Sequence, residues 1–576
     1  MTSTRKDIET RPTEDGSNDQ ERELDTGIDV DGREAAFESP EEYRQAAETE
    51  EQSWESRLEK SAEGGGGGSN HDAENSPDHK RNHEKPTAPS GDKGKVKDPN
   101  EIGWDGPDDP ANPHNWRMSR KWTAMTIVSF FTLMSPLASS MVAPALPIIS
   151  DEFGIKQGSV ESSLILSIFV LAYAFGPLIL GPLSEIFGRT KVLQVSNLLF
   201  LGFNIACGRA KTSGQMMVFR FLAGLGGSAP LAIGGGTISD LFSADNRGKA
   251  LAVYTLAPLT GPALGPVIGA WIVQFVSWRW VFYATSIADC VIQVLGLIFL
   301  RETYAPVLIA HKTRQLRKSE NNPKLRSIFV KPGHIDVHDG GPRVWAKVIG
   351  HGLMRPLKML LFQPILQVLA TYQAILYGTM YLTLTTFSAL WVEKYHYGLG
   401  ISGLHYIALG LGFTAGSQVG ARLLDHIYKR LKARNGGVGT PEMRMPLMII
   451  TAFTLPVGLI IYGWSAQHHV VWIVPDIGAF FLAAGIMGSF LPIQSYLVDT
   501  YTLYAASAIG AASSFRSLAG FGFPLFANAM FNKLGLGWGN TLLALVAMSI
   551  GIPAPILFYK YGARLRAWSL KRHNIT

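Results

Sequence analysis

The sequence has few charged residues and almost no cysteine. Only 17% of its 576 residues are Asp, Glu, Lys or Arg, whereas a soluble protein of this length carries roughly a quarter. The two cysteines, Cys207 and Cys290, each lie in an apolar run, so neither a disulfide framework nor a cysteine zinc site is expected. The sequence also lacks a phosphate-binding loop, a metal-ligating cluster and a catalytic triad. These absences argue against an enzyme, a bound metal and a cofactor.

The charged residues are concentrated before residue 117, between 301 and 360, and after 559. The N-terminal stretch combines mixed charge with a run of glycines at 64–68, and it cannot bury enough apolar surface to offset the entropy of ordering. We therefore predict a disordered cytoplasmic tail over residues 1–104. Its start has no apolar core of a cleavable signal peptide, so we expect the first internal hydrophobic helix to insert the chain.

The rest of the chain contains twelve apolar runs, and a helix needs roughly 20 such residues to cross a bilayer. They lie at approximately 122–147, 161–182, 192–209, 215–240, 249–275, 280–300, 362–392, 401–424, 445–465, 470–498, 505–531 and 538–559. This pattern predicts an all-α membrane protein with about twelve transmembrane helices in two six-helix bundles, residues 105–300 and 361–560. A central loop, 301–360, joins the bundles, and residues 561–576 form a C-terminal tail.

Lys and Arg are abundant in every second loop between the predicted helices and scarce in the other loops. The first of these other loops carries Asp151 and Glu152. By the positive-inside rule, both termini and the central loop are cytoplasmic, and the basic clusters indicate topology rather than nucleic-acid binding. Within the central loop, residues 344–361 mix apolar and basic side chains. They predict either a helix along the inner membrane surface or the start of the seventh transmembrane helix.

Two equal hydrophobic halves joined by a charged loop suggest an internal repeat. Transporters built in this way bind their substrate near the bilayer midplane, between halves that rock against each other. The sequence therefore predicts a transporter of a small-molecule substrate.

The most specific segment, GPLSEIFGRTK, lies in the short loop between the second and third helices. It matches the pattern G-x-x-x-D/E-x-x-G-R-K/R at Gly181, Glu185, Gly188, Arg189 and Lys191. The segment resembles the signature loop of the major facilitator superfamily. This resemblance implies the fold of that superfamily and a loop whose charge pairs and helix-end contacts hold the outward-facing state. A degenerate copy at 420–430, GARLLDHIYKR, follows the eighth helix and supports the repeat.

Two more motifs lie on membrane helices. At the start of the fourth helix, Arg220 begins an R-x-x-x-G-x-G pattern that the superfamily links to proton coupling or substrate approach, although a snorkelling arginine is an alternative. The fifth helix is similar to the G-x-x-x-G-P-x-x-G-G motif of the antiporter branches, with Ala270 in place of the last glycine. Small residues also serve packing alone, but the motifs together favour export. The residues of this antiporter motif are Gly261, Pro262, Gly265, Pro266 and Gly269.

Four further segments, at 110–116, 301–306, 496–499 and 516–526, resemble the fungal drug:proton antiporters with twelve spans. The likeness extends from about residue 105 to 570. It implies a monomeric plasma-membrane antiporter that exports drugs, fungicides or fungal toxins and is driven by the proton gradient.

Ionisable residues at membrane depth are candidate coupling sites. Asp289 is the only carboxylate well inside the sixth helix, where it suits either a proton carrier or a structural hydrogen bond. Asp240 and Asp499 lie near cytoplasmic helix ends, where gating pairs are expected. Arg516 in the eleventh helix needs a carboxylate, backbone or substrate partner. The candidates for proton coupling are Arg220, Asp289, Asp499 and Arg516.

Aromatic and amide side chains in the helices suit a cavity that accepts varied substrates. The candidates are Tyr173, Tyr254, Tyr372, Gln373, Tyr377, Gln494 and Tyr496, each of which could instead face lipid or a helix interface. Three other functions remain open: export of polyamines or another endogenous solute, proton-coupled nutrient uptake, and a transporter-like sensor.

Overall fold

The computed structural model describes residues 100–330, 337–338, 340–501 and 504–572. The predicted tail lies outside these residues up to position 99. Its last residues belong to the described structure, because strand β1 (Glu101–Ile102) pairs in parallel with strand β2 (Arg326–Ser327) of the central loop.

The first half consists of helices α2 to α9. Local signals set several of their ends: the Ser159 side chain caps the first turn of α4, and Thr212 caps α6 in the same way. The helices are α2 (Met118–Ser140), α3 (Leu146–Glu152), α4 (Val160–Phe187), α5 (Arg189–Gly208), α6 (Ser213–Gly227), α7 (Ala229–Leu241), α8 (Ala244–Phe275) and α9 (Arg279–Phe299), with short 3-10 turns at Pro113–Asn115 and Ala143–Ala145.

The second half consists of helices α12 to α18. They are α12 (Pro364–Ala389), α13 (Leu399–Leu404), α14 (Tyr406–Arg434), α15 (Met445–Gln467), α16 (Ile473–Thr500), α17 (Ala505–Gly551) and α18 (Pro553–Arg572). A π-helical turn at Leu390–Lys394 extends α12, and a 3-10 turn at Pro441–Arg444 precedes α15. Most residues of the predicted C-terminal tail belong to helix α18.

Eleven stretches of the described residues are long and apolar enough to span a membrane. The last of them, Ala505–Trp568, includes α17 and most of α18, and α17 is itself two helical arms, because Gly535, with a φ of 75° and a ψ of 169°, is not helical. Counting its two arms separately gives eleven plus one, or twelve, passes. The prediction of an all-α membrane protein is confirmed.

The described part of the central loop forms two helices, α10 (Ala305–Ser319) and α11 (Pro342–Phe362). Helix α11 is separate from α12 and packs against α4 of the first half and α17 of the second. The rings of Phe187 and Trp345 meet edge to face, with centroids 5.0 Å apart. The loop therefore contacts both halves.

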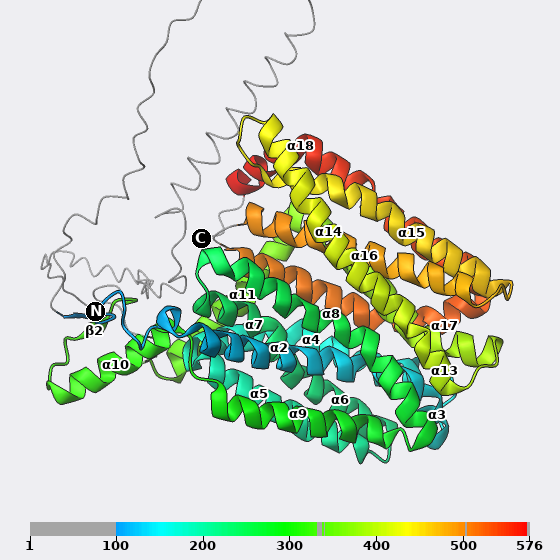
Figure 1. Cartoon of the computed structure of the whole chain (residues 1–576), viewed down its shortest axis with the longest axis horizontal. Coiled ribbons are helices and arrows are strands. Elements are labelled where there is room, and N and C mark those ends of the chain that lie inside the picture. Colours follow the sequence, from blue (N-terminus) through cyan, green and yellow to red (C-terminus); the bar gives the residue numbers. More distant parts are fainter. Residues whose placement is uncertain (1–99, 331–336, 339, 502–503, 573–576) are drawn as a thin grey trace, which may run out of the picture.

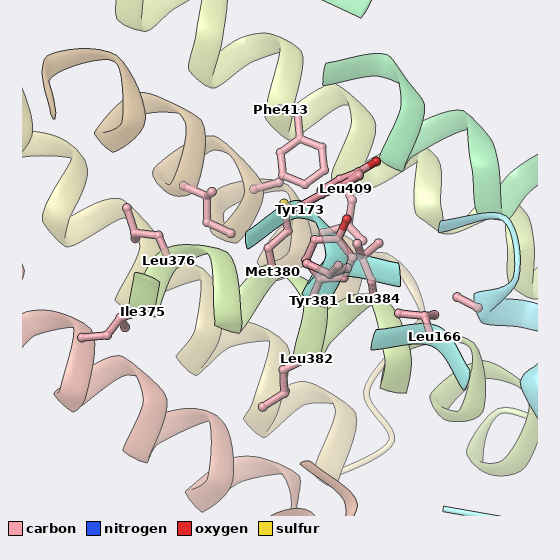
Figure 2. Close-up of a cluster of buried hydrophobic side chains, with 14 of the residues drawn as sticks. Leu166, Tyr173, Ile375, Leu376, Met380, Tyr381, Leu382, Leu384, Leu409 and Phe413 are labelled. Carbon is pink, nitrogen blue, oxygen red and sulfur yellow. The ribbon is translucent and has the colours of Figure 1, made fainter. Parts of the chain in front are cut away.

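The helices of the two halves converge toward the end that carries α3 and α13, which we call the far end (Figure 1). The opposite end carries β2, α10 and α18, and we call it the terminal end. The larger buried apolar cluster draws on both halves. Figure 2 shows part of it, where Tyr173 of α4 lies near Met380 and Tyr381 of α12.

Candidate functional site

The signature loop is a turn between α4 and α5 whose geometry requires glycine. Gly188 has a φ of +99°, a region that favours glycine, and it ends α4. The Glu302 carboxylate accepts hydrogen bonds from the backbone N–H groups of Arg189, at 2.9 Å, and Thr190, at 3.2 Å. Glu302 thus caps the positive end of α5 and connects it to the segment after α9.

The Arg189 side chain is the centre of this loop. Its Nε lies 3.3 Å from Oδ2 of Asp240, and its Nη1 donates to Ser184 Oγ at 2.7 Å. Glu185 is farther away, at 3.9 Å. The guanidinium also packs over the Tyr304 ring, 4.6 Å from its centroid. Of the other signature residues, Lys191 is exposed, and the space around Gly181 is open.

The second half carries a corresponding set of ion pairs. A gating pair was expected at Asp499, but its partner and the second pair were not predicted. Nε of Arg444, just before α15, lies 2.9 Å from Oδ2 of Asp499 at the end of α16. Arg566 donates to both carboxylate oxygens of Glu442, at 2.9 and 3.2 Å. The sequence does carry a signal for this correspondence, since a basic residue, Arg189 or Arg444, lies at the start of the third membrane helix of each half.

The prediction that the degenerate copy at 420–430 follows the eighth membrane helix is wrong. These residues lie inside α14, which continues to Arg434, and Arg422 and Arg430 are exposed. The counterpart of Arg189 in the second half is Arg444.

Arg220 is completely buried in α6, which excludes the snorkelling alternative. Its guanidinium donates to the backbone carbonyls of Ala138 and Ser139 in α2, at 3.1 and 3.2 Å. It also donates to Ile165 and Leu166 in α4, at 3.1 and 3.3 Å. Arg220 therefore joins three helices of the first half through main-chain oxygens.

The glycines of the antiporter motif face α2. A Cβ atom at Gly261 would lie 2.9 Å from the Leu137 nitrogen, and one at Gly265 would lie 2.8 Å from the Leu137 oxygen. A Cβ atom at Gly269 would lie closer still to the Met141 carbonyl oxygen. Three prolines, including Pro262 and Pro266, interrupt the hydrogen bonding of α8. The motif therefore sets a close approach of α8 to α2.

Asp289 lies inside the first half, between α9 and α5. Its Oδ2 accepts from Asn197 at 3.0 Å, and Asn197 also lies 2.8 Å from Gln293 Oε1. Gln293 in turn donates to Gln194 at 2.6 Å. Oδ1 of Asp289 is buried and accepts no hydrogen bond from any described residue. Helices α5 and α9 lie on the side of the first half away from the second half (Figure 1), so Asp289 does not face the other half.

Arg516, Tyr377 and Tyr173 lie where the two halves meet, which we call the seam. Cζ of Arg516 is 4.9 Å from the centroid of the Tyr377 ring, which is 5.0 Å from the Tyr381 ring. Tyr381 OH lies 3.2 Å from Ser139 Oγ of the first half. Tyr173 OH lies 2.6 Å from Ser135 Oγ.

The other cavity candidates occupy different places. Tyr254 donates to the Pro230 carbonyl at 2.9 Å, Tyr372 packs against Gly551, and Tyr496 stacks on Phe558, so each of these three packs inside one half. Gln373 is completely buried, and both polar atoms of its amide are without a partner in the described residues. Gln494 is half-buried in α16.

A buried histidine–carboxylate pair was also missed. Nδ1 of His405 lies 2.7 Å from Oδ2 of Asp476. The imidazole stacks on Trp391, with ring centroids 3.6 Å apart and planes 7° apart, and Tyr397 is parallel to it at 5.7 Å. His405 and Asp476 are 71 positions apart, so no local pattern connects them.

At the far end the halves contact each other directly. Gln274 of α8 accepts a hydrogen bond from the backbone N–H of Gly400, and Gly403 packs against Ala270. A Cβ atom at Gly158, before α4, would lie 3.7 Å from Cβ of Asn528 in α17. These contacts close the far end of the seam.

Comparison with known proteins identifies the family. The sequence profile of the Major Facilitator Superfamily matches residues 128–524. The "Uncharacterized transporter C1529.01" of Schizosaccharomyces pombe is 47% identical over 472 residues, which are 82% of this chain and 94% of that protein. The "Efflux pump vrtL" of Penicillium aethiopicum is 45% identical and covers 82% of this chain and 92% of its own length.

Solved structures agree on the fold. An inward open conformation of the xylose transporter XylE from E. coli superposes with a TM-score of 0.57 and 14% identity. The superposed region covers 77% of this chain and 96% of the XylE chain. The chain is a membrane transporter rather than an enzyme, and it belongs to the major facilitator superfamily.

Proposed function

We propose that this transporter exports small organic molecules in exchange for protons by alternating access. The observation that carries this proposal is the seam, which is closed at the far end and holds Arg516 and several tyrosines at mid-depth. A molecule bound there is released on one side or the other according to which end of the seam opens.

The positive-inside rule assigns the terminal end to the cytoplasm, since the basic residues of the central loop and of α18 lie there. In that orientation the far end is extracellular, and its closure corresponds to an inward-facing state. We assign the protein to the plasma membrane, where a proton gradient is its energy source, and we expect a monomer.

Export, rather than uptake, is supported by the names of two relatives, the efflux pumps vrtL and radE, the latter 43% identical and from Floropilus chiversii. For the proton, two buried carboxylates are the best candidates: Asp289, one oxygen of which accepts no hydrogen bond from a described residue, and Asp476, paired with His405. Because Asp289 faces away from the second half, its coupling to the seam would act through the packing of the first half.

The test is flux into inside-out membrane vesicles from cells expressing the protein, with acid inside and a panel of fluorescent amphipathic cations, anions and neutral compounds. Accumulation that disappears when an ionophore collapses the gradient is the expected result. Asp289→Asn and Asp476→Asn report which carboxylate couples. Accumulation only in right-side-out vesicles with acid outside would establish uptake instead, and no flux in either orientation would favour a sensor.

A further inference from the structure

Arg516 lies near the middle of the first arm of α17, about 17 Å along the helix from Ala505 at 1.5 Å per residue. Its guanidinium lies against two rings of the second half: its Cζ is 4.9 Å from the centroid of Tyr377 on α12 and 5.4 Å from that of Phe490 on α16. One turn farther along α17, a Cβ at Gly520 would lie 3.1 Å from Val170 of α4. This face of α17 therefore meets the first half.

The charge of Arg516 is not neutralised by the described part of the chain. Arg516 makes no hydrogen bond or ion pair with any described residue, and its Nε is buried without a partner. Arg220 is the contrast, because four backbone carbonyls accept from its guanidinium. An arginine at membrane depth is expensive unless a partner or a cavity accommodates it.

The helices around Arg516 cannot supply a carboxylate at its depth. Helices α2, α12 and α17 contain neither Asp nor Glu. In α4 the acidic residues are Glu161 and Glu185, close to its two ends, and in α16 they are Asp476 and Asp499, also close to the ends. The anion that completes this site must therefore come from outside these helices.

The remaining neighbours are aromatic rings and neutral polar groups. Gln373 lies one turn from Tyr377 on the same face of α12, and its buried amide offers both a donor and an acceptor without partners. Tyr173 of the first half lies near Tyr381, whose ring centroid is 5.0 Å from that of Tyr377 (Figure 2). Such a lining binds a ring and a single acidic group together.

We propose that Arg516 binds the carboxylate of an aromatic organic acid, so that anionic aromatic molecules are the preferred substrate class. A guanidinium presents two parallel N–H donors that match a carboxylate, and the interaction is strong where water is excluded. A substrate cation would instead meet the like charge of Arg516. This inference rests on the proposed transport function and adds the charge of the substrate.

The experiment measures equilibrium binding of two probes with the same fluorophore and opposite charge, dansylglycine and dansylcadaverine, to the purified full chain in lipid nanodiscs. The wild type is expected to bind dansylglycine in preference. Arg516→Gln should weaken dansylglycine binding about 10- to 100-fold, the range for hydrogen bonds to a charged group, and should abolish the preference. Arg516→Lys should retain the preference with weaker binding.

Two controls keep the outcome clear. Arg209→Gln removes the same charge from an exposed position at the end of α5 and should leave both probes unaffected. Thermal unfolding verifies that each variant is folded. Undiminished dansylglycine binding by folded Arg516→Gln, stronger binding of dansylcadaverine by the wild type, or no saturable binding of dansylglycine would each overturn the inference. Gradient-driven export restricted to cations would overturn it while leaving the transport function intact.

Discussion

Nε of Arg189 lies 3.3 Å from Oδ2 of Asp240, and this ion pair ties the start of α5 to the end of α7. In the second half, Arg444 and Asp499 make the same connection between α15 and α16 at 2.9 Å. Each pair joins the third and fourth membrane helices of its half at the terminal end. The internal repeat thus extends to the charged contacts that hold each half together.

The two ion pairs should differ in their contribution to stability because they differ in burial. The side chains of Arg189 and Asp240 are 6% and 19% exposed, whereas those of Arg444 and Asp499 are 19% and 31% exposed. We expect Asp240→Asn to cost about 3 kcal/mol, near the value for a buried pair, and Asp499→Asn to cost about 1 kcal/mol. Thermal unfolding in detergent compares them, and an equal or larger effect of Asp499→Asn would contradict the ranking.

Gly265→Ala should disrupt the packing of α8 on α2. The new methyl group would meet Ser140 Oγ and the Leu137 carbonyl, and such overpacking costs about 1–3 kcal/mol. Both the unfolding temperature and the flux should fall. Gly202→Ala in α5 is the matched control, since a Cβ there meets nothing within 4 Å. Normal stability and flux for Gly265→Ala would show that the two helices separate easily.

Loss of His405 should destabilise the far end of the second half. His405→Ala leaves the Asp476 carboxylate without its 2.7 Å partner, and the other oxygen of Asp476 accepts no hydrogen bond within the described structure. Breaking a buried pair in this way costs about 3 kcal/mol. His426→Ala, at an exposed position of α14, should have no effect. If both variants unfold at the wild-type temperature, the pair contributes nothing to stability.

The helices and the signature loop could be predicted from the sequence because their signals are local. Apolar runs of sufficient length mark the membrane helices, and Gly188 marks the turn that ends α4. The wrong placement of the copy at 420–430 also has a local cause. Residues 421–434 contain neither Gly nor Pro, so nothing stops α14 where the corresponding helix of the first half ends.

The partners of the site residues could not be predicted. Glu302 reaches Arg189 across 113 positions, and only the packing of α9 beside α5 brings them together. The free guanidinium of Arg516 was equally hidden, because a sequence shows that an arginine needs a partner without showing which residues surround it. Asp289 was placed correctly in its helix, but only the structure shows that it faces α5.

The central claim is that the halves separate at the far end during each transport cycle. Gly158→Cys and Asn528→Cys place two Cβ atoms about 3.7 Å apart across the closed seam, within the range for a disulfide. Because Gly158 has a φ of +71°, which disfavours a side chain, Gly158→Ala is the control for the strain of the substitution itself. The background is Cys290→Ser, since Cys290 is exposed whereas Cys207 is buried.

Gradient-driven flux into vesicles, measured before and after oxidation, is the decisive observation. The account predicts that the oxidised double variant loses flux, that dithiothreitol restores it, and that each single-cysteine variant is insensitive to both treatments. Undiminished flux through a fully cross-linked protein would contradict alternating access at this end.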